Sequence, residues 1–287
     1  MWSIHARQGD APVEDYGELF EVLAGMGATE RIWENEDKAV AVPSFDRLDN
    51  LVRLTAYEGP RGQPIIFDTG EATERIQPLE PDEIVATKTH VLIDIDRREA
   101  IIEYNHRGAK AIDIAIVLGV SARRNRGWES TFIDFSPKVD RSFVEGVDKF
   151  ERIRVAGFRI ARPNTDWTDW DNELARSALD SGAQSAQAEY TAPRGDSLAH
   201  NSGVIPFIRE RAADGVAALK SAFVTGRRRG EAAETTITTG DHKEHQRVAV
   251  RLDPDQQVDE QDINRRLAEY HDARQATGES GQDEQAA

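Results

Sequence analysis

The sequence predicts an α+β fold of two domains, with mainly antiparallel sheets and packed helices. Short β-branched segments separated by Gly, Pro, Asp and Asn are typical of antiparallel strands. Helical segments fall between them at irregular intervals, which does not fit the regular alternation of a parallel doubly wound sheet. The length of 287 residues suits two ordinary domains, each with its own core.

The first half of the chain begins with an amphipathic helix over residues 14–26, because Leu19, Phe20 and Leu23 fall on one helical face. Strands are then expected at residues 38–42, 51–57, 64–67 and 84–95. The last of these forms a hairpin, in which residues 91–95 pair with 100–104 through a turn at 96–98.

The apolar run at residues 109–118 fits a buried helix or a strand, because a short apolar run does not fix the period. We expect a helix, since Gly119 suits a C-terminal cap. The elements expected next are a strand at 131–135, a helix at 139–150 and a strand at 152–162.

The rest of the chain is predicted to be mixed in the same way. Residues 166–179 form a helix that turns Trp167 and Trp170 to the core. The further expected elements are a strand at 184–191, a helix at 204–219, strands near Ala222, Thr235 and Val248, and a helix at 259–271. The Gly, Ser, Gln and Glu content beyond residue 271 predicts disorder. The expected domains are residues 1–135 and 136–252, followed by an acidic helix and tail at 253–287.

Composition sets limits on function. The formal net charge of −16 argues against a uniformly positive surface for nucleic acid, and leaves room for a local one. The absence of cysteine excludes disulfides and thiolate chemistry and fits a reducing, cytoplasmic location. No stretch approaches the roughly 20 apolar residues of a membrane span, so we expect no direct membrane insertion.

Two acidic residues are the best candidates for catalysis. Asp94 and Asp96 would share one face of a strand, as metal-binding carboxylates of a nuclease do; a solvated strand face is the alternative. His242 and His245 lie in a polar turn and match no known ligand spacing. No Gly-rich loop has phosphate-binding spacing. We therefore expect no cofactor, no resident metal and no catalytic residue.

Three arginine-rich clusters are the candidates for binding. The first lies in residues 107–126, where five basic residues stand against one acid, and its arginines are Arg123, Arg124 and Arg126. The second is Arg227, Arg228 and Arg229, at an expected hairpin tip where guanidinium groups can contact phosphates without reading bases.

The third cluster depends on a β-bulge. The apolar residues between Arg152 and Ile160 fall on odd positions before Gly157 and on even positions after it. A bulge at residues 156–157 would restore one apolar face and bring Arg152, Arg154 and Arg159 onto the other. The alternative is that these arginines pair with nearby acids.

The order of segments resembles the RexA-like family of phage exclusion proteins. The resemblance rests on residues 109–120, on Phe132-Ile133-Asp134-Phe135-Ser136-Pro137-Lys138, and on the 194–198 loop (Arg-Gly-Asp-Ser-Leu) before a helix. It covers roughly residues 90–250 as a pattern, without a catalytic motif. It implies a two-domain, non-enzymatic, dimeric prophage protein that binds DNA with little sequence preference and acts beside a separate membrane protein. The net charge of −16 departs from what such a protein would ideally carry.

The sequence therefore predicts an antiviral defence protein of the superinfection-exclusion type, binding DNA through its arginine clusters. Two alternatives stay open: a metal-dependent nuclease-like enzyme that uses Asp94 and Asp96, and a protein-interaction module whose acidic tail mimics or shields a polyanion.

Overall fold

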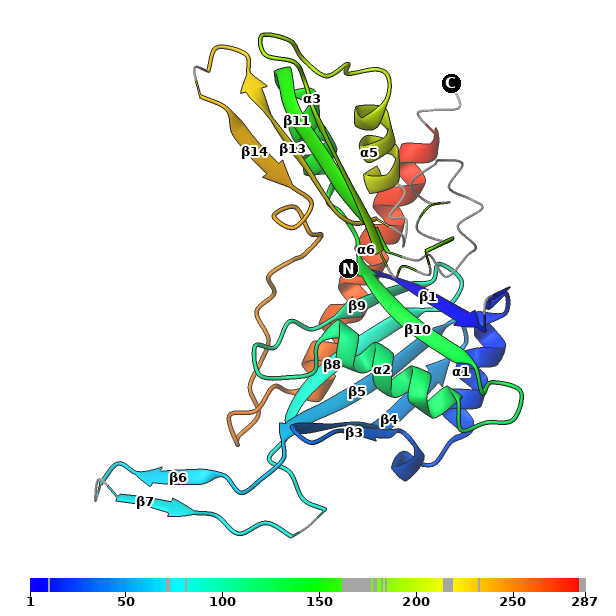
Figure 1. Ribbon diagram of the computed structural model, residues 1–287. Helices are drawn as coiled ribbons and strands as arrows, with labels where there is room; N and C mark the ends of the chain where they lie inside the picture. The colour runs from blue at the N-terminus through cyan, green and yellow to red at the C-terminus, as the bar shows by residue number, and fades with distance from the viewer. Residues whose placement is uncertain are drawn as a thin grey trace. The chain divides into compact units, whose positions relative to one another are not determined.

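The computed structural model confirms an α+β protein built on antiparallel sheets (Figure 1). It describes residues 1–283 apart from residue 10, residues 71, 72 and 81, most of 162–184, residues 214–218 and residue 232. The chain forms two compact units: unit 1 contains Met1–Glu14 and Asp134–Arg247, and unit 2 contains Asp15–Ile133 and Val248–Ala287. Each unit thus takes in two separate stretches of chain. The three consecutive domains expected from the sequence stay a prediction.

Unit 2 is built on an antiparallel sheet with the strand order β9-β8-β5-β4-β3. Its strands are β3 (Ile32–Glu34), β4 (Lys38–Leu48), β5 (Leu51–Pro60), β8 (Thr87–Asp94) and β9 (Glu99–Ile102). The expected hairpin is confirmed, since β8 and β9 pair from Val91↔Ile102 to Asp94↔Glu99. A separate two-stranded sheet contains β6 (Ile65–Asp68) and β7 (Thr73–Ile76).

The helices of unit 2 follow from apolar patterning and capping. Helix α1 (Tyr16–Gly25) starts where the Asp15 carboxylate accepts a hydrogen bond from the Glu18 N–H at 2.9 Å, and it buries the expected apolar face. A short 3-10 turn, η1 (Ala28–Glu30), follows it. Helix α2 (Ala111–Ala122) confirms the helical reading of the apolar run. The expected cap at Gly119 is wrong, because the helix continues through this residue to Ala122.

The C-terminal helix of unit 2, α6 (Glu260–Asp283), begins one residue after the expected start and runs beyond the expected end at His271. The helix packs against β8, and its Ile263 and Leu267 are buried. Residues 284–287 lie outside the described part of the chain.

Unit 1 contains a four-stranded antiparallel sheet with the order β12-β11-β13-β14. Its strands are β11 (Phe150–Ala161), β12 (Ser185–Thr191), β13 (Leu219–Arg228) and β14 (Thr235–Thr238). Helices α3 (Arg141–Asp148) and α5 (Val204–Ala213) pack on one face of this sheet, where Phe143 and Ile208 meet Ile153 and Phe158 in the core. Unit 1 also includes β1 (Trp2–Gln8), β2 (Ala11–Pro12) and most of β10 (Thr131–Pro137).

Some sequence-based expectations for this region were wrong. The helix expected at 204–219 ends at Ala213, and Leu219 already belongs to β13. No strand forms at Val248, which lies in an irregular segment. Strand β1 was not expected. The helix expected at 166–179, with Trp167 and Trp170, falls outside the described residues apart from Ser177.

Candidate nucleic-acid interface

The register of β11 decides which side chains share a face of the unit 1 sheet. Its pairing with β13 is interrupted between Phe150 and Arg152, and again between Ile153 and Val155, so Arg154 has no partner residue. The bulge expected at residues 156–157 is therefore wrong in its position: the register shifts around residue 151 and around Arg154, and a third irregularity lies between Arg159 and Ile160. Pairing is regular at Gly157, which faces Phe223. A glycine is needed there because an added Cβ would lie 2.5 Å from Cε1 of Phe223.

The two faces of this sheet have different chemistry. Ala156, Phe158, Val224 and Ile237 point to the helices and are buried. Because cross-strand partners share a face, the remaining positions form a second face, which we call the arginine face. Its members are Arg152, Val155, Gly157 and Arg159 in β11, Gln187, Glu189 and Thr191 in β12, Ser221, Phe223, Thr225 and Arg227 in β13, and Thr236 and Thr238 in β14. Apart from Gly157, these residues are exposed or half-buried.

Arg227 of the second cluster lies on this face with Arg152 and Arg159 of the third. Arg152 and Arg227 are partners on adjacent strands, and Arg154 lies beside them at the bulge. Arg159 lies seven residues further along β11, roughly 20 Å from Arg152 in an extended strand. Arg228 is different: it pairs with the buried Phe150 and lies over that ring at 6.0 Å, on the helix-covered face. Arg229 is exposed in the turn after β13.

Hydrogen bonds and one ion pair position these arginine side chains, but carboxylates do not neutralise every guanidinium charge. Nε of Arg152 donates to the Asp196 carbonyl at 2.8 Å, and Arg159 donates to the Ser185 hydroxyl at 3.2 Å. Arg154 forms an ion pair with Glu234 at 3.1 Å. Within the described ranges, no carboxylate pairs with Arg152, Arg159 or Arg227; Glu189 is the acidic member of the face itself. Like charges on opposed strand positions destabilise a sheet, so the Arg152–Arg227 pair favours a bound anion.

The first arginine cluster belongs to unit 2 and is largely used in the fold. Arg123 donates to the Thr131 carbonyl at 2.8 Å and lies over the Phe132 ring. Arg124 donates to the carbonyls of Glu30 and Ile32. Arg126 is exposed. Arg123 and Arg124 therefore bind backbone carbonyls of η1, β3 and the start of β10.

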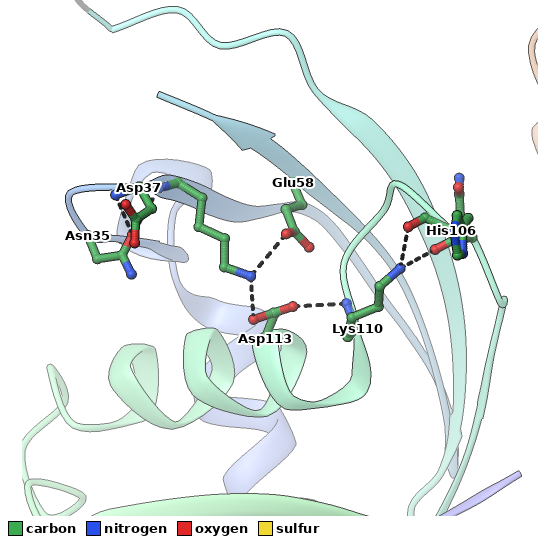
Figure 2. Close-up of polar contacts among 8 residues, drawn as sticks. Asn35, Asp37, Glu58, His106, Lys110 and Asp113 are labelled. Carbon is green, nitrogen blue, oxygen red and sulfur yellow. Dashed lines mark hydrogen bonds and ion pairs between the residues drawn. The ribbon is translucent and has the colours of Figure 1, made fainter. Parts of the chain in front are cut away.

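A polar network at the start of α2 uses two more basic residues of unit 2 (Figure 2). Nζ of Lys38 lies 2.9 Å from Glu58 and 2.7 Å from Asp113, and the other oxygen of Asp113 accepts from the Lys110 N–H. Burial lowers the pKa of Lys38, but hydrogen bonds and charge attraction from Asp113 and Glu58 outweigh it and raise the pKa overall. Nζ of Lys110 donates to the carbonyls of Asn105 and His106. Both lysine ammonium groups are therefore occupied by contacts within unit 2.

The candidate metal ligands are separated. Asp94 is 2% exposed and accepts a hydrogen bond from the Arg97 N–H, while Asp96 is exposed in the turn. His242 contacts the Ser142 hydroxyl at 2.8 Å, and His245 contacts the Lys243 carbonyl. Across the residues whose positions are given, no three His, Asp or Glu side chains gather as metal ligands. The helices described are all too short or too polar to cross a bilayer.

Sequence reasoning missed Phe223 as a member of the arginine face. It sits in the apolar run Ala222-Phe223-Val224, which gives no alternation to show which side chain faces outward. Its register opposite Gly157 would have been the signal, but only a known β11–β13 pairing supplies it.

No protein-family model matches the chain, and no curated protein has significant similarity to it.

Proposed function

We propose that the chain is a non-enzymatic DNA-binding protein that contacts the phosphate backbone through the arginine face, with little sequence preference. The observation that carries the proposal is the pairing of Arg152 with Arg227 on adjacent strands, without an acidic partner among the described residues. Arg159 lies further along β11 on the same face, whereas the charge of Arg154 at the bulge is paired with Glu234.

The charge distribution supports a local site. With a net charge of −16, the protein as a whole repels DNA, so a positive strip has to provide the attraction. A guanidinium group can donate two parallel hydrogen bonds to phosphate oxygens. Such contacts with the phosphate do not distinguish one base from another. Binding should therefore weaken steeply with salt, because each neutralised phosphate releases counterions.

The experiment is fluorescence anisotropy of labelled duplex DNA with the purified full chain at several salt concentrations. The double change Arg152→Gln and Arg227→Gln should weaken binding at least tenfold for every sequence tested. It should also flatten the plot of log affinity against log salt by about 0.9 for each phosphate that the protein no longer neutralises.

The matched control is Arg124→Gln with Arg126→Gln, which removes the same charge from unit 2. The control should bind DNA almost as tightly as the unchanged protein. Absence of binding at low salt, or equal weakening in both double variants, would contradict the proposal.

The resemblance to phage exclusion proteins extends this proposal to antiviral defence in the cytoplasm. In this role the chain forms a homodimer and acts beside a separate membrane protein. Expression of the chain in a susceptible host should lower the plaque count of an infecting phage. The Arg152→Gln, Arg227→Gln variant, expressed at the same level, should restore it. Equal protection by both proteins would separate any defence role from DNA binding.

A protein-interaction module is the second candidate, because the β6–β7 hairpin exposes apolar side chains. Ile65 and Ile76 are cross-strand partners and are 66% and 59% exposed. Contiguous exposed apolar side chains mark candidate contact sites on a protein surface. Replacing both by Thr should abolish self-association in sedimentation if the hairpin joins two copies of the chain, whereas an unchanged sedimentation coefficient would remove this role.

A further inference from the structure

Phe223 occupies the arginine face and not the core of unit 1. Its neighbours Ala222 and Val224 point to the helices, so the alternation of β13 turns Phe223 to the opposite side. A Cβ on Gly157 would lie 2.5 Å from Cε1 and 2.7 Å from Cζ of Phe223. The ring therefore extends across β11 and covers the Gly157 backbone, while the side chain remains half-buried.

The order of side chains along the sheet places this ring between positive charges. In the register of β11 with β13, Phe223 is opposite Gly157, which lies between Arg152 and Arg159 in β11. Polar groups surround the ring position: Thr238 is its partner in β14, the hydroxyls of Thr225 and Thr236 contact each other at 2.8 Å, and the acidic Glu189 of β12 is the partner of Gly157 beneath the ring. The face thus offers an aromatic ring with an arginine on either side along β11 and one carboxylate, that of Glu189, on the neighbouring strand.

This combination fits an unpaired nucleic-acid strand. Proteins bind single strands through a positive surface that follows the phosphates and aromatic rings on which bases stack. In a duplex the base faces are already stacked, so a duplex could use the arginines but not the ring. Duplex binding would therefore make no use of the Phe223 ring.

We infer that the arginine face binds single-stranded nucleic acid, with Phe223 stacking on one base and Arg152, Arg159 and Arg227 contacting the flanking phosphates. The inference rests on the proposed function and goes beyond it by naming the form of nucleic acid. It predicts a contribution from the bases themselves, independent of the phosphate charge.

The test compares three labelled probes with the full chain: oligothymidine, an abasic strand with the same number of phosphates, and oligothymidine paired with oligoadenine. Oligothymidine should bind about tenfold more tightly than the abasic strand, because one base stacked on a ring contributes that much. Phe223→Leu should abolish this difference and leave the affinity for the abasic strand unchanged. Phe223→Tyr should preserve it.

Binding to the abasic strand and a thermal melt show whether Phe223→Leu is folded. If that variant unfolds, Phe223→Tyr and Phe223→Met replace it in the test. Stacking on the ring is supported when Phe223→Tyr keeps the preference for oligothymidine and a folded Phe223→Met loses it. Equal affinity of the unchanged protein for the thymidine and abasic strands would overturn the inference, while salt-sensitive binding that depends on Arg152 and Arg227 would leave the proposed function standing. Failure to bind any probe would overturn both.

Discussion

Nε2 of His271 in α6 lies 2.8 Å from the Oδ2 of Asp94 at the end of β8. Both side chains are buried, with exposed fractions of 7% and 2% for the two residues. The other oxygen of Asp94 accepts the Arg97 N–H at 3.0 Å, and Gln275 contacts His271 at 3.0 Å. This buried contact attaches the C-terminal helix of unit 2 to its sheet.

Replacement of Asp94 should therefore destabilise the protein. Asp94→Ala leaves the Arg97 N–H and the His271 ring without their acceptor, so the free energy of unfolding should fall by about 1–3 kcal/mol. Urea denaturation followed by circular dichroism measures it. Asp96→Ala is the matched control, because that side chain is exposed, and it should change stability by less than about 0.5 kcal/mol. Similar losses in the two variants would contradict this structural role.

Arg31 should make a large contribution to stability. The residue is 5% exposed, and its guanidinium donates to the carbonyls of Leu23, Met26, Val42 and Pro43, which connects the end of α1 to β4. Burial lowers its pKa, with a smaller opposing effect of Glu30. Arg31→Met leaves several buried carbonyls unpaired, so we expect a loss of about 2–4 kcal/mol in urea denaturation.

The control for Arg31 is Arg61→Met, since Arg61 is an exposed arginine that pairs with the exposed Glu34. Surface ion pairs contribute little, so this variant should unfold within about 0.5 kcal/mol of the unchanged protein. If Arg31→Met lowers the free energy of unfolding no more than Arg61→Met does, the prediction is contradicted, because the buried carbonyls must then have found other donors.

The parts of the fold that follow from local pattern were predictable. The apolar spacing of Leu19, Phe20 and Leu23 gave α1, and the β8–β9 hairpin follows from two β-branched runs around a polar turn. Strand β1 was missed because Ile4 and Ala6 are its only fully buried hydrophobic positions, too few to stand out in seven residues.

The candidate site could be predicted only in pieces. Each arginine cluster is visible in the sequence, but Arg152 and Arg227 become neighbours through a pairing of strands that are distant along the chain. Local propensity carries no information about that register, nor about the face on which Phe223 lies. Arg228 illustrates the same limit, because alternation sends it to the opposite face from Arg227.

Gly226 should be essential for the geometry of the arginine face. A Cβ at this position would overlap the carbonyl oxygen of Arg152 and lie 3.0 Å from the Phe150 ring. Gly226→Ala should therefore force the two central strands apart and cost about 1–3 kcal/mol of stability. Because Arg227 is the next residue, DNA affinity should fall as well.

Gly25→Ala provides the contrast, since nothing lies within 4 Å of the added Cβ in the last position of α1. Alanine favours the helix, so stability should be unchanged or should rise by up to about 1 kcal/mol. A thermal melt of both variants decides the matter; a tolerated Gly226→Ala would mean that the β11–β13 register can shift.

Asp262 should make α6 sensitive to acid. Its carboxylate accepts a hydrogen bond from the Arg251 N–H at 2.8 Å, and this bond is the main cause that lowers the pKa of Asp262. Burial raises that pKa, and the ion pair with Arg265 lowers it further. A lowered pKa in the folded state means that the carboxylate stabilises the fold above its unfolded pKa of about 3.9. That stabilisation is lost as pH falls below this value.

Asp262→Asn should therefore be less stable at neutral pH and should lose less stability on acidification, as measured by urea midpoints between about pH 3 and pH 6. Asp255→Asn, in the exposed turn before α6, should retain the acid dependence of the unchanged protein. Identical pH profiles for the Asp262 variant and the unchanged protein would show that this carboxylate does not couple the helix to pH.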